Sequence, residues 1–242
     1  MLRKKFLIAT CVALVLLALL VVFGYLLFSY AVRQPSISTK EELHYEVWDA
    51  LWRQNTQLVE SLIQRNPELL KDRKDGETLL HAAAGNGNEE LVLFLLQRGM
   101  DPDIRDILGG NTPLQICAIQ CTWNLSDAQA AHYCAVARLL IRHGANVNAR
   151  AETGAAVLYF ATGSHLSLIK LLIENGADPT VRVTELGKSC TYADCAKDCG
   201  NQVGAKYLSK VLQRAVGTGV QRGVRRENEG GTDENQQRDG AR

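Results

Sequence analysis

Apolar residues follow two different patterns along this chain. Residues 6–32 form one block without a charged side chain. A helix needs about 20 apolar residues to cross the hydrocarbon core of a membrane, so this block predicts a single transmembrane helix. After residue 45 the apolar residues recur every three or four positions, as Val92, Leu95 and Leu96 do. This spacing predicts amphipathic helices that bury one face.

The residues that flank the apolar block predict its orientation. Residues 1–5 include three consecutive basic residues, and basic flanks stay in the cytoplasm. The rest of the chain is then exported and held at the membrane by an uncleaved signal anchor. A cleaved secretory signal is the alternative, because Ser29 and Ala31 are small enough for a signal peptidase site. Both alternatives export the rest of the chain.

A short pattern recurs along the remaining sequence. Residues 110–118 (GNTPLQICA) copy the pattern of residues 76–84 (GETLLHAAA), and a third copy begins at Gly154. The sequence resembles ankyrin repeats, which have a period of 33 residues and the signature T-P-L-H-x-A. This resemblance implies an all-α ankyrin-repeat solenoid of about five helix pairs after the transmembrane helix.

The repeated residues also predict where the helices begin and end. Thr78 and Thr112 stand where a side-chain oxygen can cap the first helix of a repeat. Gly99, Gly144 and Gly176 stand where the second helix ends in a left-handed conformation. Since no single repeat can bury its apolar stripe, the repeats must stack.

Composition completes the predicted domain organisation. The polar stretch before the repeats predicts a linker, and the last residues predict disorder because they have few large apolar side chains. The predicted segments are a cytoplasmic basic region (1–5), a transmembrane helix (6–32), a linker (33–44), an ankyrin repeat domain (45–215) and a disordered tail (216–242).

One repeat contains an insertion. The stretch 112–144 is about 11 residues longer than the equivalent stretch 78–99. Insertions in repeat proteins lie on the surface and often on the binding face, so Trp123 and Tyr133 are candidate partner contacts. The alternative is that both rings pack back onto their own stack.

The charge pattern excludes a general attraction to nucleic acid and suggests a local surface. With 27 basic and 26 acidic residues the formal net charge is +1. Four arginines precede successive repeats at similar positions, and stacking would align them in a ladder that binds carboxylates of a partner. These candidate contacts are Arg73, Arg105, Arg150 and Arg182. The alternative is that neighbouring acidic residues neutralise the ladder.

Six cysteines follow the apolar block, and an exported domain favours disulfides. Cys121 ends the first helix of a repeat and Cys134 begins the second, so we predict a Cys121–Cys134 bridge at the base of the insertion. Cys117 is expected in the core. The other three are Cys190, Cys195 and Cys199, for which a bridge from Cys190 or a zinc site stays open, although the spacing lacks the C-x-x-C pairs of zinc modules.

Motifs for catalysis and cofactor binding are missing from the sequence. His81 falls on the histidine of the ankyrin signature, where such a residue ordinarily bonds neighbouring backbone, and the glycine-rich phosphate loops are missing. We therefore predict a protein that is not an enzyme and has no cofactor or metal.

The resemblance implies binding of a protein partner through the concave ankyrin surface. With the predicted anchor, the domain would lie outside the inner membrane of a bacterium, in the periplasm. There it could be an inhibitor or immunity protein against a periplasm-acting toxin or lipase. The alternative is a scaffold or protective partner of envelope or oxidative-stress proteins.

Overall fold

A computed structural model describes residues 40–185 and 188–229. The predicted segments 1–5 and 6–32 lie outside these residues, and within them no helix is long and apolar enough to cross a membrane. The first described helix begins at Lys40, inside the predicted linker 33–44.

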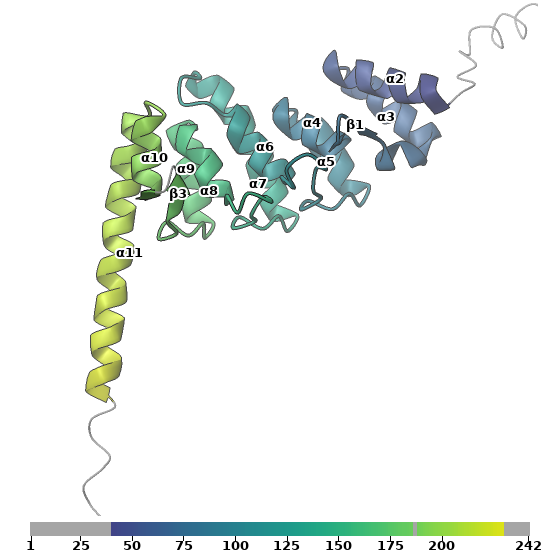
Figure 1. Cartoon of the computed structure of the whole chain (residues 1–242). Helices are drawn as coiled ribbons and strands as arrows, with labels where there is room; N and C mark the ends of the chain where they lie inside the picture. The colour runs from purple at the N-terminus through teal and green to yellow at the C-terminus, as the bar shows by residue number, and fades with distance from the viewer. Residues whose placement is uncertain (1–39, 186–187, 230–242) are drawn as a thin grey trace, which may run out of the picture. The chain divides into compact units, whose positions relative to one another are not determined.

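The described residues form a row of helix pairs (Figure 1). The pairs are α2 (Lys40–Trp52) with α3 (Thr56–Arg65), α4 (Leu79–Gly85) with α5 (Glu89–Gln97), α6 (Pro113–Gln120) with α7 (Asp127–Arg142), α8 (Val157–Phe160) and the 3-10 turn η2 (Ala161–Gly163) with α9 (Leu166–Glu174), and α10 (Tyr192–Asp198) with α11 (Gln202–Glu229). The 3-10 turn η1 (Pro67–Lys71) follows α3, and two antiparallel hairpins pair β1 (Arg73–Lys74) with β2 (Glu77–Thr78) and β3 (Val183–Glu185) with β4 (Lys188–Cys190). The predicted helical repeat fold is thus confirmed in the described part.

The first helices begin as the sequence predicts. Thr78 and Thr112 are N-caps, and in each case the third helical residue completes a reciprocal capping box. That residue is His81 in α4 and Gln115 in α6. Both side chains also donate hydrogen bonds to the backbone across the repeat boundary. His81, for example, donates to the carbonyl of Asn111 at 2.9 Å.

The helices stack in two layers. First helices pack on first helices, as α4 does on α6 and α6 on α8, and second helices pack on second helices, as α5 does on α7 and α7 on α9. Small residues such as Ala83 and Cys117 are fully buried between the layers, together with Leu80 and Leu114. Close approach of the helices requires these small side chains.

The last helix departs from the sequence expectation. We expected a disordered tail from residue 216, but α11 continues without a break from Gln202 to Glu229, beyond its contacts with α9 and α10 (Figure 1). The stretch 216–229 lacks proline, which would end a helix, and its three arginines and two glutamates favour a helix, whereas its three glycines disfavour one. Residues 230–242 lie outside the described residues.

Candidate partner-binding surface

The arginine ladder exists, and its guanidinium groups contact the chain's own backbone. Nη1 of Arg73 donates to the carbonyl of Gly76 in its own turn and to the carbonyl of Arg105 in the next turn, both at 3.0 Å. Nη1 of Arg105 repeats this arrangement, donating to Gly110 at 2.6 Å and to Arg150 at 2.7 Å. Each of these arginines therefore joins two consecutive turns.

The next two arginines continue the series with local contacts. Nη1 of Arg150 donates to the carbonyl of Gly154 at 2.9 Å. Arg182 binds Ser189 across the β3–β4 hairpin, to its hydroxyl at 2.8 Å and its carbonyl at 3.0 Å. Binding of partner carboxylates by the ladder stays a prediction, and the contacts in the structure give these arginines a stabilising role.

The acidic residue Asp106 beside the ladder is used in a turn. Its carboxylate accepts hydrogen bonds from the backbone of Gly109 at 2.8 Å and from the side chain of Asn111 at 2.9 Å. Burial alone would raise the pKa of Asp106, but these hydrogen bonds outweigh it and lower the pKa. Asp106 therefore holds the turn that carries the next arginine-to-carbonyl contact.

The insertion lengthens α7, and the two candidate aromatic residues lie in different environments. The helix α7 has 16 residues, whereas α5 and α9 have 9 each. On α7, Tyr133 donates its hydroxyl to the carbonyl of Gly85 at 3.3 Å, so this ring packs back on the preceding repeat. Trp123 keeps 48% of its surface exposed, and its backbone N–H donates to Gly163 at 2.9 Å. Of the two, Trp123 is the accessible one.

The predicted Cys121–Cys134 bridge is not formed in the structure. Both cysteines are buried free thiols, and the same holds for Cys117. The reason lies in their neighbours: Cys134 points its sulfur at the hydroxyl of Ser167, 3.3 Å away on α9. The sulfur of Cys117 donates to the carbonyl of Tyr133 at 3.4 Å. Burial raises the pKa of Cys121 to about 11, which suppresses its reactive thiolate.

The second set of cysteines is also unbridged in the structure. Cys195 is buried, Cys190 is half-buried and Cys199 is exposed, and no disulfide joins any of the three. Within the described residues no group of three His, Cys, Asp or Glu side chains is placed to hold a metal ion.

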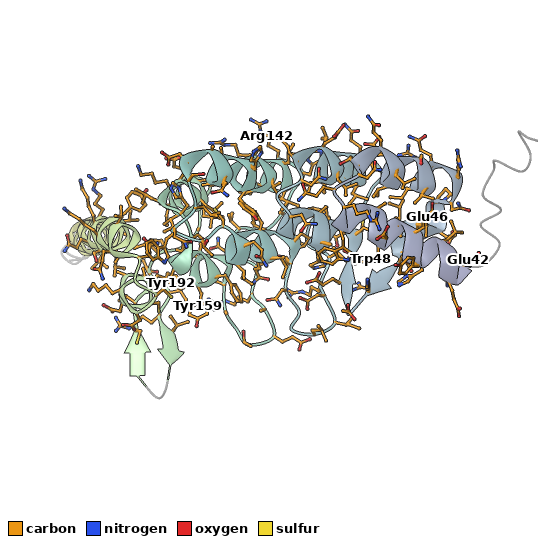
Figure 2. All side chains as sticks on the ribbon, turned by 90° about the horizontal axis from the view of Figure 1, so that it is seen from above. Glu42, Glu46, Trp48, Arg142, Tyr159 and Tyr192 are labelled. Carbon is orange, nitrogen blue, oxygen red and sulfur yellow. The ribbon has the colours of Figure 1, made fainter. Side chains whose placement is uncertain are left out.

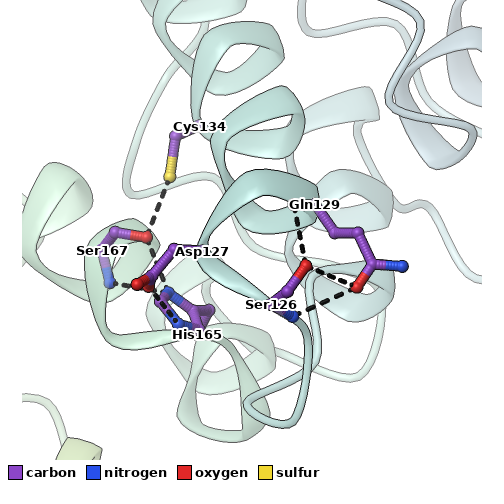
Figure 3. Close-up of polar contacts among 6 residues, drawn as sticks. All are labelled: Ser126, Asp127, Gln129, Cys134, His165 and Ser167. Atoms are coloured by element: carbon purple, nitrogen blue, oxygen red, sulfur yellow. Dashed lines mark hydrogen bonds and ion pairs between the residues drawn. The ribbon is translucent and has the colours of Figure 1, made fainter.

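A carboxylate, an imidazole and a hydroxyl meet where α7 and α9 begin (Figure 3). Asp127 lies 3.3 Å from Nε2 of His165, and Nδ1 of the same ring accepts from the hydroxyl of Ser167 at 2.8 Å. A serine hydrolase triad has the same sequence of contacts, from carboxylate to imidazole to hydroxyl. However, Nδ1 also faces the backbone N–H of Ser167 at 3.4 Å, so the ring serves as the N-cap of α9. Asp127 is 99% exposed, which leaves its charge in water. The cluster joins two helices.

An apolar surface that the sequence analysis missed lies along the first helices. The segments α4, α6 and α8 contain no charged residue. Ile119 at the end of α6 is 42% exposed. With Tyr159 and Phe160 of α8 it lines a hollow of about 290 Å³ that reaches Asp198 at the end of α10 and Cys199 directly after it. We call Ile119, Trp123, Tyr159 and Phe160 the apolar strip; Tyr159 is labelled in Figure 2.

The strip could have been found by aligning the repeats. Ile119 stands nine residues after the glycine that opens its repeat, where the preceding repeat has Gly85. Phe160 stands where the first copy has Ala82, and Tyr159 where it has His81. Large apolar side chains thus replace small or polar ones at three positions of the first helices, and Ile119 is the most exposed of them.

Comparison with known proteins agrees with the two-layer stack. A family model described as ankyrin repeats in three copies matches residues 47–128, and a single ankyrin repeat model matches residues 109–152. Residues 47–152 are thus similar to ankyrin repeats. Beyond residue 152, the same helix-pair layout continues through α8, η2 and α9 to α10 and α11.

The chain spans a quarter or less of the length of the following similar curated proteins. The chain is 35% identical over 122 residues to the B-cell lymphoma 3 protein homolog of Mus musculus, a match that covers 50% of this chain and 25% of that protein. It is 33% identical over 115 residues to the BCL-6 corepressor-like protein 1 of Homo sapiens, a match that covers 47% of this chain and 6% of that protein. It is 27% identical over 147 residues to the potassium channel AKT2/3 of Arabidopsis thaliana, a match that covers 51% of this chain and 18% of the channel. These matches show what the repeats are similar to. Ankyrin repeats are protein-binding modules that generally lack enzymatic activity.

Proposed function

We propose that this ankyrin domain binds its protein partner through the apolar strip. The main support is the exposure of Ile119 (42%) and Trp123 (48%) beside a mainly apolar hollow, which Ile119, Tyr159 and Phe160 line and which Asp198 borders. Fully desolvated apolar and aromatic anchors contribute most of the affinity at protein interfaces. The partner should therefore insert an uncharged apolar side chain into the hollow.

Affinity capture with the wild-type domain and with Ile119→Asp tests this proposal. The aspartate places a charge at the edge of the hollow, and we expect capture to fall at least about tenfold, as for a hot-spot residue. The matched control is Val216→Asp, which makes the same kind of change at a residue of α11 that is 54% exposed. Equal capture by both variants and the wild type would contradict the proposal.

We further propose that residues 6–32 anchor the domain outside the cytoplasmic membrane. The support is the length of this uncharged block and the basic residues that precede it. A reporter enzyme that is active only outside the cytoplasm, fused after Arg242, should be active and sediment with membranes. Activity in the cytoplasm would contradict this topology.

The proposed role of the tethered domain is inhibition of a toxin or lipase that acts in the periplasm. A binding surface without catalytic machinery suits a blocking protein. The test is the rate of the captured partner: an equimolar amount of the domain should abolish its activity, and Ile119→Asp should restore it. A partner whose activity is unchanged or increased supports the alternative role of scaffold or protective partner.

A further inference from the structure

The outer side of α2 exposes two aromatic side chains. Tyr45 is 70% exposed and Trp52 is 53% exposed. The two residues are seven positions apart, which is about two turns, so they lie on one side of the helix. The terminal repeat of a solenoid normally presents a polar outer surface to water. Two large rings at this place indicate a contact surface.

This side of α2 is also acidic. Glu41 and Glu42 belong to the first turn of the helix. Glu46 and Asp49 follow, and Asp49 lies 2.9 Å from Arg53. We call Tyr45, Trp52 and the four acidic residues the acidic face of α2; Glu42 and Glu46 are labelled in Figure 2.

The last helix has a surface of opposite charge. Val203 is 63% exposed, and Lys206, Lys210 and Arg214 are exposed as well. Their spacing of three and four residues places them on one side of α11. The opposite side, with Ala205 and Leu208 at 1% exposure, is buried against the stack. We call Val203, Lys206, Lys210 and Arg214 the basic face of α11.

The sequence strengthens this contrast. From Gln202 to Arg226 there are six basic residues and no acidic one. The near-zero net charge of the whole chain therefore hides a strong separation of charge between its first and last described helices. A separation of this kind steers oppositely charged surfaces together.

We propose that the basic face of α11 binds the acidic face of α2 of a second copy of this chain. Lysine and arginine side chains would pair with the carboxylates and stack on the rings of Tyr45 and Trp52, a favourable cation–π arrangement. Val203 would cover apolar ring surface. Because the two faces belong to different ends of the repeat row, the contact is heterologous and joins copies head to tail. This inference does not depend on the partner surface proposed above.

Sedimentation velocity of the full chain in detergent micelles tests the proposal. At about 20 mM salt the protein should sediment as a concentration-dependent assembly, and at about 300 mM salt as a monomer, since salt screens surface charges. A wild type that remains monomeric at low salt up to about 100 µM, where even weak contacts form, would overturn the proposal.

Two charge-reversed variants make the test specific. One carries Glu41→Lys, Glu42→Lys and Glu46→Lys, which leaves only Asp49, itself paired with Arg53, as an acidic residue of α2, and is basic on both faces. The other carries Lys206→Glu and Lys210→Glu and is acidic on both faces. Each variant alone should associate at least about tenfold more weakly than the wild type, because like charges meet. A mixture of the two restores opposite charges at every contact and should associate as the wild type does. A mixture that stays monomeric would contradict the proposal even if both variants fold.

Two further measurements test a control variant and a competing ligand of the basic face. Glu68→Lys, Glu89→Lys and Glu90→Lys together change the charge by the same amount outside α2 and α11 and should leave association unchanged. Anionic lipid is the competing occupant of the basic face. If the wild type in nanodiscs binds phosphatidylglycerol vesicles through Lys206 and Lys210 and remains a monomer, the proposal is wrong.

Discussion

The guanidinium of Arg105 donates to the backbone carbonyl of Arg150 at 2.7 Å, across the boundary between two repeats. The same nitrogen binds the carbonyl of Gly110 in its own turn. The backbone carbonyl of Arg105 in turn accepts from Arg73. Each arginine therefore fixes the turn of the next, and the ladder couples repeats that otherwise meet through helix packing.

The first prediction concerns this coupling. Arg105→Ala should lower the free energy of unfolding by about 1–2 kcal/mol, because two hydrogen bonds from a charged group are lost at a partly exposed site. Urea unfolding followed by circular dichroism measures the change. The control is Arg142→Ala, at an exposed arginine that points away from the stack in Figure 2. Equal stability of the two variants would show that the ladder does not hold the repeats together.

The second prediction concerns pH. Burial lowers the pKa of His81 below its usual value near 6.5, with the hydrogen bond to Asn111, the charge of Asp106 and that of Arg73 as smaller influences. The unfolded chain therefore binds a proton more readily than the folded one. The stability that neutral His81 provides is present above about pH 6.5 and is lost as the pH falls below it.

His81→Gln should remove this contribution. The neutral amide of Gln115 already occupies the equivalent position of the next repeat, where it accepts from Thr112 at 2.7 Å and donates to Ala149 at 3.2 Å. We expect the wild type to lose more stability than His81→Gln between pH 7 and pH 5, by up to about 1.4 kcal/mol per pH unit. Identical pH profiles in urea unfolding would mean that His81 titrates normally.

The third prediction concerns a buried amide near the end of the stack. Asn201 is 4% exposed. It donates to the carbonyls of Thr162 at 3.0 Å and Ser164 at 2.8 Å, and it accepts from the backbone of Gly204 at 2.9 Å. Asn201→Ala leaves these groups without their partner and should cost about 2–4 kcal/mol. Gln202→Ala, at the exposed neighbour, should cost less than about 0.5 kcal/mol. A thermal shift of the same size in both variants would refute this assignment.

The fourth prediction concerns the thiols. Cys199 is exposed and should be alkylated first, whereas Cys117 and Cys121 should react only after unfolding, because burial raises the pKa of both. Peptide-level mass spectrometry after timed alkylation measures this order. Non-reduced intact mass checks the predicted bridge in the same sample: a loss of two protons that maps to Cys121 and Cys134 would contradict the free thiols of the structure.

The repeat fold could be predicted because its determinants are local. Thr78 and Thr112 cap helices through residues three positions away, and Gly99, Gly144 and Gly176 adopt the expected positive φ angles of 84°, 100° and 92°. Such signals are readable within one repeat. They can be recognised without knowing which helix surfaces pack against each other.

The binding surface was harder to predict because it depends on contacts between repeats. The alignment of Arg73, Arg105 and Arg150 was visible, but their acceptors are backbone carbonyls, which every residue has. The sequence likewise located the insertion but could not separate Trp123, which stays accessible, from Tyr133, which packs on the preceding turn. Ile119 was missed because the apolar pattern of α6 alone does not show which of its side chains the neighbouring repeats leave exposed.

A hydrogen–deuterium exchange footprint of the complex with the captured partner tests most directly whether the apolar strip is the partner-binding site. We expect slower exchange at residues 116–123 and 159–163, which carry Ile119, Trp123, Tyr159 and Phe160, and little change in α5 and α9. Protection confined to the arginine-bearing turns around residues 105–110 and 150–154, with none at the strip, would contradict it.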